Sequence, residues 1–212
     1  MTKRLVLLLV LAAVAAAVLA PTAGATRLLP LSAHPNGLAY EQWHVIWDDV
    51  SFNRSTQSRN SVIAVRGNKC GFAKGKVWLL PVSINGVLDV HCTIPQGKIL
   101  AIVVAGWADW AKGENKLRKS MRDGFRLLER ATLTVDGRSV RPGYVLQTPF
   151  LHVNMPVRNS YSVPPGPMSY MAKEHFALLS PLSAGEHLIS TRGFFAVDDG
   201  VTLGFDYHLT IG

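Results

Sequence analysis

The sequence has little from which a metal cluster or a cross-linked scaffold could be built, because only two of its 212 residues are cysteines. Two cysteines exclude four-cysteine zinc sites and the disulfide-dense frameworks of small secreted domains. The chain also lacks a Gly-x-Ser-x-Gly elbow, a His-Glu-x-x-His helix and a P-loop. These signatures are usual in serine esterases, zinc peptidases and nucleotide hydrolases. We therefore expect no metal and no cofactor, and an enzyme is the less favoured class.

Long apolar runs are missing too, except at the start of the chain. Two basic residues precede an apolar run of 16 residues from Leu5 to Ala20, and the small residues Ala-Gly-Ala follow at 23–25. This order is typical of a secretory signal peptide. The run is shorter than the roughly 20 residues that cross a bilayer, and no cysteine for lipid attachment stands at the cleavage site. We expect cleavage near Ala25 and a secreted or periplasmic product rather than an uncleaved anchor.

No Ser-, Gly- or Pro-rich stretch is long enough to be a linker between domains. With residues 1–25 as a signal peptide, residues 26–212 remain, a length that suits one domain with a sizeable core. The proline-rich passage from Pro156 to Pro167 is interpreted as a long loop inside that domain. We therefore expect a single domain.

Cys70 and Cys92 are the two cysteines, and in an oxidising compartment an isolated pair favours a disulfide. Closing the intervening loop would stabilise the fold by roughly 3 kcal/mol on a chain-entropy estimate. His91 is adjacent to Cys92 in the sequence, but neighbours on a strand point to opposite faces. The two are therefore badly placed to act as base and nucleophile.

Most of the chain has the pattern of β-strands. Two Asn-Gly or Asp-Gly pairs predict hairpins, because a type I′ turn needs positive φ at both central residues. The first is Asn85-Gly86, between segments 77–82 and 87–93, and the second is Asp136-Gly137, between segments 132–135 and 139–140. Further strands are expected at 99–105, 145–153, 176–179, 187–191 and 203–211. The last alternates apolar and polar residues, so one face packs and the other meets solvent or ligand.

Two segments have helical spacing instead. From Leu38 to Val50, apolar residues recur at i, i+3, i+4 and i+7, starting at Trp43. From Gly113 to Glu129, an apolar stripe faces a basic side, and this helix either packs on its own sheet, which is favoured, or lies on an anionic surface. Many short strands and two short helices predict a mainly β fold, an antiparallel β-sandwich or jelly-roll-like domain.

Positive charge is concentrated in two regions. Beyond the signal peptide, residues 27–76 and 112–130 each carry seven basic and three acidic residues. Such regions attract polyanions, and the attraction fades with salt. Nucleic acid is not expected as a partner of an exported protein, which leaves anionic envelope polymers, acidic glycans or, at most peripherally, lipid headgroups. The alternative is a merely solvated basic face.

Ligand contacts on this side of the protein are expected from aromatic and basic residues. Trp107 and Trp110 could form an exposed platform on which a sugar ring stacks, although tryptophans more often belong to the core. The candidate residues for binding an anionic polymer or glycan are Trp107, Trp110, Lys112, Lys119, Arg126 and Arg130.

Several short passages of the chain form a recognisable combination. They are Cys-Gly at 70–71, Val-Trp-Leu-Leu at 77–80, Cys-Thr-Ile-Pro at 92–95, Val-Asp-Gly at 135–137, Thr-Pro-Phe at 148–150, Pro-Leu-Ser-Ala-Gly-Glu-His at 181–187 and Asp-Tyr-His-Leu-Thr at 206–210. Together they resemble an uncharacterised family of exported bacterial proteins, over roughly 40–211. In that family a Trp-rich helix precedes a β-rich domain that begins with paired cysteines. The resemblance implies compartment and fold, and it implies no catalytic residue.

The chain departs from that family at two places. Ala-Ile-Val-Val stands at 101–104 where bulky aromatic residues are usual, and Lys-Glu-His stands at 173–175 where an Asp-Gly-aromatic run is usual. A ligand site built on those positions would be altered in this chain.

Scattered histidines and carboxylates are the remaining polar candidates. Asp206 and His208 share one face of the last strand, and His175 or His187 could join them from a neighbouring strand. A glycan or ester hydrolase would need at least two of these four residues to meet in one cleft. The adjacent pairs 174–175 and 186–187, each Glu-His, diverge on a strand and form no dyad alone.

Three functions of different classes therefore remain open. In order, they are a non-enzymatic envelope protein that binds polyanions or glycans, a hydrolase with a His and carboxylate site, and a structural domain whose partner is another protein chain.

Overall fold

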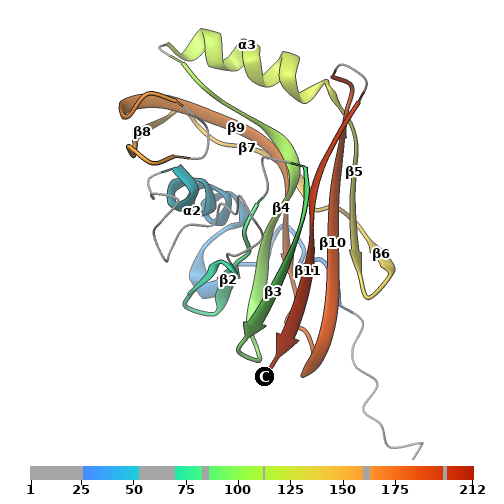
Figure 1. Ribbon diagram of the computed structural model, residues 1–212. Helices are drawn as coiled ribbons and strands as arrows, with labels where there is room; N and C mark the ends of the chain where they lie inside the picture. The colour runs from blue at the N-terminus through green and yellow to red at the C-terminus, as the bar shows by residue number, and fades with distance from the viewer. Residues whose placement is uncertain (1–25, 53–69, 83–85, 112, 160–162, 198–199) are drawn as a thin grey trace, which may run out of the picture.

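Two β-sheets packed face to face form the body of the molecule (Figure 1). The computed structural model describes residues 26–52, 70–82, 86–111, 113–159, 163–197 and 200–212. The expected signal peptide, residues 1–25, lies outside the described residues. In the described ranges no helix combines the length and apolar character needed to cross a membrane.

The first sheet contains six described strands. Its order is β1 (Phe72–Lys74), β2 (Val77–Leu79), β4 (Ile99–Trp110), β9 (Gly166–Leu179) and β7 (Tyr144–Gln147), and β8 (Leu151–Met155) also pairs with β9. The pair β2–β4 is parallel and the other pairs of this sheet are antiparallel.

The second sheet contains five described strands. Its order is β3 (Val87–Ile94), β11 (Val201–Ile211), β10 (Gly185–Phe195), β5 (Leu128–Val135) and β6 (Arg138–Val140). Here β3 and β11 are parallel and the other pairs are antiparallel. The expected mainly β, sandwich-like class is confirmed, and the two parallel pairs make both sheets mixed rather than purely antiparallel.

The predicted hairpin around Asn85-Gly86 is wrong, although Asn85 itself lies outside the described residues. Strand β2 belongs to the first sheet and β3 to the second, so the segment between them crosses from one sheet to the other. Pro81 stands two residues after the end of β2 and has no N–H with which to continue a ladder. The hairpin at Asp136-Gly137 is confirmed: both residues have positive φ, 50° and 73°, and they join the antiparallel strands β5 and β6.

The single strand expected at 145–153 is two strands. The chain leaves the sheet after β7 at Thr148-Pro149-Phe150 and returns as β8, because Pro149 cannot donate to a neighbour. Thr148 itself is still bonded to β9. Its N–H donates to the Ala172 carbonyl at 2.9 Å, and its Oγ1 accepts from the Ala172 N–H at 2.9 Å. The strand expected at 176–179 is only the end of the long strand β9.

The main core lies between the two sheets. The inward residues of β3, β4, β5, β9, β10 and β11 form it, among them Val90, Ile102, Ile189 and Leu209. The expected disulfide is confirmed, since Cys70 and Cys92 are bonded and Cys92 packs in this core. The alternation predicted for β11 is also present, with Phe205, Tyr207, Leu209 and Ile211 buried.

Helix α2 (Tyr40–Phe52) packs on the outer face of the first sheet, as its periodicity predicts. Tyr40, Trp43 and Trp47 are buried against β2, β4 and β9. The Trp47 indole donates to the Leu80 carbonyl at 3.0 Å, which ties the helix to the end of β2. Since residues four apart share one helix face, the stripe that carries Tyr40 also turns His44 and Asp48 toward the sheet.

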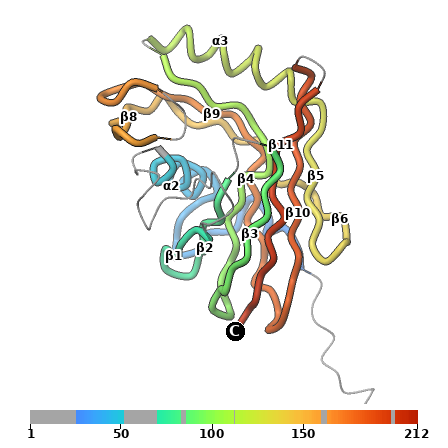
Figure 2. Tube along the Cα trace, viewed as in Figure 1, coloured from blue at the N-terminus to red at the C-terminus, as the bar shows by residue number. Residues whose placement is uncertain are grey.

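Helix α3 (Glu114–Phe125) lies across the far ends of β4 and β9, and Figure 2 shows both strands bending toward it. Its residues Leu117 and Met121 are buried with Met171, next to Trp107. The preferred interpretation of this basic helix, that its apolar stripe packs on its own sheet, is confirmed. The helix ends before Leu128, which begins β5 instead of extending the stripe.

Candidate functional site

Three ionisable side chains meet beneath the bend of the first sheet. His44 and Asp48 come from α2, and Glu174 comes from β9. The His44 Nε2 atom lies 3.0 Å from Glu174 Oε2 and 3.5 Å from Asp48 Oδ2. All three residues are buried, with relative exposures of 1%, 0% and 7%. Buried ionisable groups are costly unless they are paired, so such a cluster is a candidate functional site.

The surroundings of Asp48 are unusual for a buried carboxylate. Tyr170 donates its hydroxyl to Asp48 Oδ1 at 3.1 Å. The other oxygen, Oδ2, accepts no hydrogen bond from any described residue. Burial, together with the charge of Glu174, raises the pKa of Asp48 well above its ordinary value despite His44 and Tyr170. One oxygen of the cluster is therefore left without a hydrogen-bond donor in the protein interior.

The protonation of His44 is set by its two acidic neighbours. Burial alone would lower the pKa of His44, but the charge of Asp48 and the hydrogen bond and charge of Glu174 raise it above the ordinary value. Both pKa shifts favour the protonated forms of His44 and Asp48, and these two neighbours do not titrate independently of each other.

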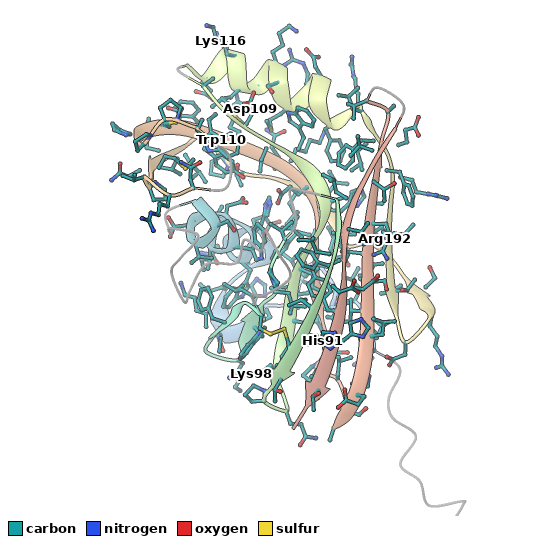
Figure 3. All side chains as sticks on the ribbon, in the orientation of Figure 1. His91, Lys98, Asp109, Trp110, Lys116 and Arg192 are labelled. Carbon is teal, nitrogen blue, oxygen red and sulfur yellow. A yellow bond between two sulfur atoms is a disulfide. The ribbon has the colours of Figure 1, made fainter. Side chains whose placement is uncertain are left out.

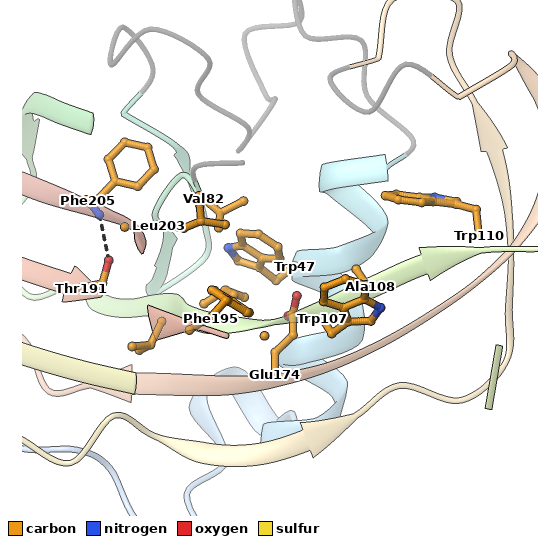
Figure 4. Close-up of a pocket in the computed structure, with 15 residues that line it drawn as sticks. Trp47, Val82, Trp107, Ala108, Trp110, Glu174, Thr191, Phe195, Leu203 and Phe205 are labelled. Carbon is orange, nitrogen blue, oxygen red and sulfur yellow. Dashed lines mark hydrogen bonds between the residues drawn. The ribbon is translucent and has the colours of Figure 1, made fainter. Parts of the chain in front are cut away.

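A cavity of about 210 Å³ opens beside this cluster (Figure 4). Most of its wall is apolar and comes from α2, β4 and the facing ends of β10 and β11, including Trp47, Val103, Phe195, Leu203 and Phe205. Among the described residues that line it, Glu174 is the sole ionisable one. The Thr191 hydroxyl accepts a hydrogen bond from the Phe205 N–H at 3.1 Å. The cavity is therefore an apolar chamber with one carboxylate in its wall.

The cavity follows from how β4 is paired. Strand β2 covers β4 only from Ile99 to Ala101, so beyond that point no described strand pairs with this edge. The register with β9 shifts between Val103 and Ala105, which increases the local bend. The cavity lies along this unpaired edge of β4, with α2 on one side and the ends of β10 and β11 on the other.

The predicted aromatic platform does not form as one surface. Trp107 and Trp110 belong to different clusters on opposite faces of β4. The Trp107 indole donates to Ser120 Oγ at 3.3 Å under α3, whereas Trp110 packs near Tyr170. Each residue borders the cavity at a different wall (Figure 4).

The predicted basic residues lie on or near α3, apart from the cluster. Lys112 is outside the described residues. The exposed Lys119 donates to Asp123 Oδ2 at 2.5 Å, Arg126 is exposed at the end of α3, and the Arg130 guanidinium lies 4.1 Å from the Phe194 ring centroid. In Figure 3 Lys116 marks this helix, far from His91 and Arg192 on the second sheet.

The four residues proposed for a hydrolase site do not meet in the cavity. His175 stacks on Phe125 under α3, with its pKa lowered by burial and by the charge of Arg141. His187 Nδ1 lies 2.8 Å from Asp136 Oδ2. Asp206 and His208 do share the outer face of β11, as expected, but Asp206 binds Arg192 and His208 stacks on His91.

The sequence reasoning therefore missed His44, Asp48 and Glu174 as a group. Glu174 was considered only with its neighbour His175, and the two point to opposite faces of β9. A usable signal was present in α2, because His44 and Asp48 fall on the same stripe as Tyr40 and Trp47. Polar residues inside a predicted buried stripe need a partner, and that partner comes from β9.

Comparisons with known proteins do not assign this chain to a family. No family model matches the chain, and no curated protein matches it. Among solved structures, the solution structure of amebosin matches over 59% of this chain and 98% of that chain, at 10% sequence identity. Its TM-score of 0.20 is too low to support any argument about fold or function.

Proposed function

We propose that the protein is an exported binding protein that holds a small ligand, with an apolar body and one polar end, in the cavity beside Glu174. The observation that carries the proposal is an apolar cavity with a single ionisable residue in its described lining. Ligand sites are typically concave and apolar, with a few polar groups that fix orientation.

The size of the cavity limits the ligand. Its volume of about 210 Å³ is below the roughly 300–1,000 Å³ of pockets that hold drug-sized molecules, so the bound part has on the order of ten non-hydrogen atoms. The apolar wall favours a hydrocarbon or aromatic body. A polar end is favoured near Glu174, because this carboxylate is paired with His44 but keeps further acceptor positions that an apolar group would desolvate.

The compartment is part of the proposal. The basic, apolar and small residues of the first 25 positions support export, and the Cys70–Cys92 disulfide is of the kind that persists in oxidising compartments. Both observations together support a secreted or periplasmic location.

The test is a titration followed by tryptophan fluorescence, because three tryptophans line the cavity: Trp47, Trp107 and Trp110. The probe is 4-phenylbutanol, and 1,4-butanediol serves as the matched compound without an aromatic body. We expect saturable quenching with the first compound and none with the second. Equal responses to both, or no saturation with 4-phenylbutanol, would remove the proposal.

A pair of matched variants locates the binding. Val82→Phe fills part of the cavity, and Val157→Phe makes the same change at a side chain that is 83% exposed and outside the lining. We expect Val82→Phe to weaken 4-phenylbutanol binding by roughly tenfold, through lost contact area. Val157→Phe should bind like the unaltered protein.

A second candidate function is the binding of an anionic envelope polymer or acidic glycan by α3. The exposed face of this helix carries Lys116, Arg118, Lys119 and Arg122, with Arg126 at its end. Its two acidic residues, Glu114 and Asp123, are paired with Arg118 and Lys119. The remaining positive charge supports a salt-dependent contact with a polyanion.

Adsorption to dextran sulfate beads over a range of salt concentrations tests this second candidate. The double variant Lys116→Glu/Arg126→Glu should lose most of the adsorption, since it reverses charge on α3. The control Lys74→Glu/Lys76→Glu changes the net charge equally at exposed residues of the β1–β2 region. An equal loss in both variants would mean a non-specific charge effect and contradict the α3 contact.

A further inference from the structure

We propose that His44, Asp48 and Glu174 bind a divalent transition-metal ion, through one nitrogen and two carboxylate oxygens, at the wall of the cavity. The donor atoms are His44 Nε2, Asp48 Oδ2 and Glu174 Oε2. One imidazole and two carboxylates form a donor set that suits Zn²⁺ and related ions. This inference differs from the sequence analysis, in which we expected no metal.

The separations of the donor atoms are those of ligands that share one ion. Two ligands about 2.1 Å from an ion lie about 3.0 Å apart in cis octahedral geometry and about 3.4 Å apart in tetrahedral geometry. The measured distances from His44 Nε2 are 3.0 Å to Glu174 Oε2 and 3.5 Å to Asp48 Oδ2. All three donor atoms lie within 4.8 Å of one another. Small side-chain rotations are therefore enough to enclose an ion.

The buried oxygen of Asp48 points independently to a ligand. Asp48 is fully buried, and its Oδ2 atom has no hydrogen-bond donor among the described residues, although it faces His44 Nε2. A buried carboxylate oxygen normally accepts at least one hydrogen bond. A metal ion supplies the partner that this oxygen lacks.

The outer contacts of the cluster fit the same assignment. Tyr170 holds Asp48 Oδ1 through its hydroxyl at 3.1 Å, and this contact orients the second oxygen toward the other donors. With a neutral imidazole, two carboxylates balance the double charge of the ion, so the occupied site carries no net charge in its apolar surroundings.

The cavity gives the ion an open side. Glu174 belongs both to the cluster and to the cavity wall. Three protein ligands with a free position are typical of sites where a metal binds an exogenous group. This part of the inference rests on the proposed function: the polar end of the cavity ligand would coordinate the ion, which favours ligands with a hydroxamate or carboxylate end.

Cobalt is a suitable probe, because Co²⁺ occupies zinc-type sites and absorbs visible light according to its ligands. Protein freed of metal with a chelator is titrated with Co²⁺, and the bound metal is counted by equilibrium dialysis. We expect saturation at one ion per chain, with a d–d spectrum of nitrogen and oxygen ligands and a rise in melting temperature. Absence of saturable binding would overturn the inference.

Variants assign the ligands. Asp48→Asn, Glu174→Gln and His44→Gln preserve size and should each weaken Co²⁺ binding by roughly tenfold or more, as should Tyr170→Phe through its orienting contact. The matched control is His208→Gln, since His208 lies at an exposed carboxylate, Asp89, on the outer face of the second sheet. If His208→Gln abolishes binding, or Asp48→Asn leaves it unchanged in a folded protein, the assignment fails.

A final comparison separates this inference from the proposed function. Binding of 4-phenylbutanol is measured on metal-free protein, and the Co²⁺ spectrum is measured with and without 4-phenylbutanohydroxamic acid. We expect the hydroxamate to change the spectrum, because it enters the coordination sphere from the cavity. Cavity binding without Co²⁺ binding would refute the metal site alone, and Co²⁺ binding without cavity binding would refute the proposed function alone. An unchanged spectrum would refute the open position.

Discussion

Gly106 and Glu174 are paired across β4 and β9, and the glycine leaves the space in which the Glu174 side chain lies. A Cβ atom on Gly106 would stand 2.4 Å from Glu174 Cγ and 2.6 Å from its Cα. The carboxylate therefore reaches His44 and the cavity because the residue beside it has no side chain.

The first prediction concerns this space. Gly106→Ala should destabilise the protein by about 1–3 kcal/mol, since the added methyl meets the Glu174 backbone as well as its side chain and neither can move freely. Urea unfolding measures the change. The control Gly212→Ala has nothing within 4 Å of its added methyl and should be nearly neutral. A neutral Gly106→Ala would contradict the described packing.

The disulfide gives a second prediction. The double variant Cys70→Ala/Cys92→Ala should lose about 3 kcal/mol of unfolding free energy, because the bond closes a loop with a sequence separation of 22. Guanidinium unfolding of this variant should match that of the reduced, unaltered protein. If reduction costs much less than the double substitution, packing of the Cys92 side chain rather than chain cross-linking is the main contribution.

A third prediction follows from the ion pair on the outer face of the second sheet. Partial burial raises the pKa of Asp206, but hydrogen bonds from Arg192 and Ser190 and the charges of Arg192 and His208 outweigh it and hold the pKa below its ordinary value. A carboxyl whose pKa is lowered by folding stabilises the protein above its unfolded pKa, and this contribution is lost as the pH falls through the folded value. Asp206→Asn should therefore cost about 1 kcal/mol at neutral pH.

The pH series contains its own control. The difference in stability between the Asp206→Asn variant and the unaltered protein should shrink as the pH falls below the ordinary range of an aspartate, and it should stay constant from pH 6 to 8. Thermal melts in a set of buffers measure it. A difference that persists fully in strong acid would show that the amide perturbs packing rather than the ion pair.

A fourth prediction concerns the contact between the second sheet and the crossing segment. The hydroxyl of Tyr207 is buried and donates to the Pro81 carbonyl at 2.7 Å. Tyr207→Phe should cost about 1–2 kcal/mol, because the carbonyl is left without its donor in the interior. Urea unfolding measures the loss, and an unchanged or raised midpoint would mean that water replaces the hydroxyl.

Features that depend on local sequence could be predicted. The stripe of α2, the alternation along β11 and the turn at Asp136-Gly137 depend on residues within about two turns or one hairpin, and all three are present. The disulfide could be predicted because the chain has only two cysteines and an oxidising compartment is expected. The prediction of a hairpin at Asn85-Gly86 was wrong because β2 pairs with β4 and β3 pairs with β11 instead of with each other. No local pattern in the sequence indicates those partners.

The cluster could be predicted only in part. His44 and Asp48 lie one turn apart on a predicted buried face, so the sequence marks them as polar residues that need a partner. The identity of that partner depends on the register of β9 with β4 and on the missing side chain of Gly106, both of which arise from pairing far along the chain. The sequence therefore indicates the need for a partner but not Glu174.

The place of β11 in the second sheet affects when the molecule can assemble. Strand β3 has β11 as its sole described neighbour in that sheet, and β11 is synthesised after all the other described strands. Until β11 arrives, β3 has an unpaired backbone and the inter-sheet core lacks one wall. Such late, long-range pairing is slow, so the polypeptide stays open during synthesis and the core between the sheets closes only after the last strand has been made.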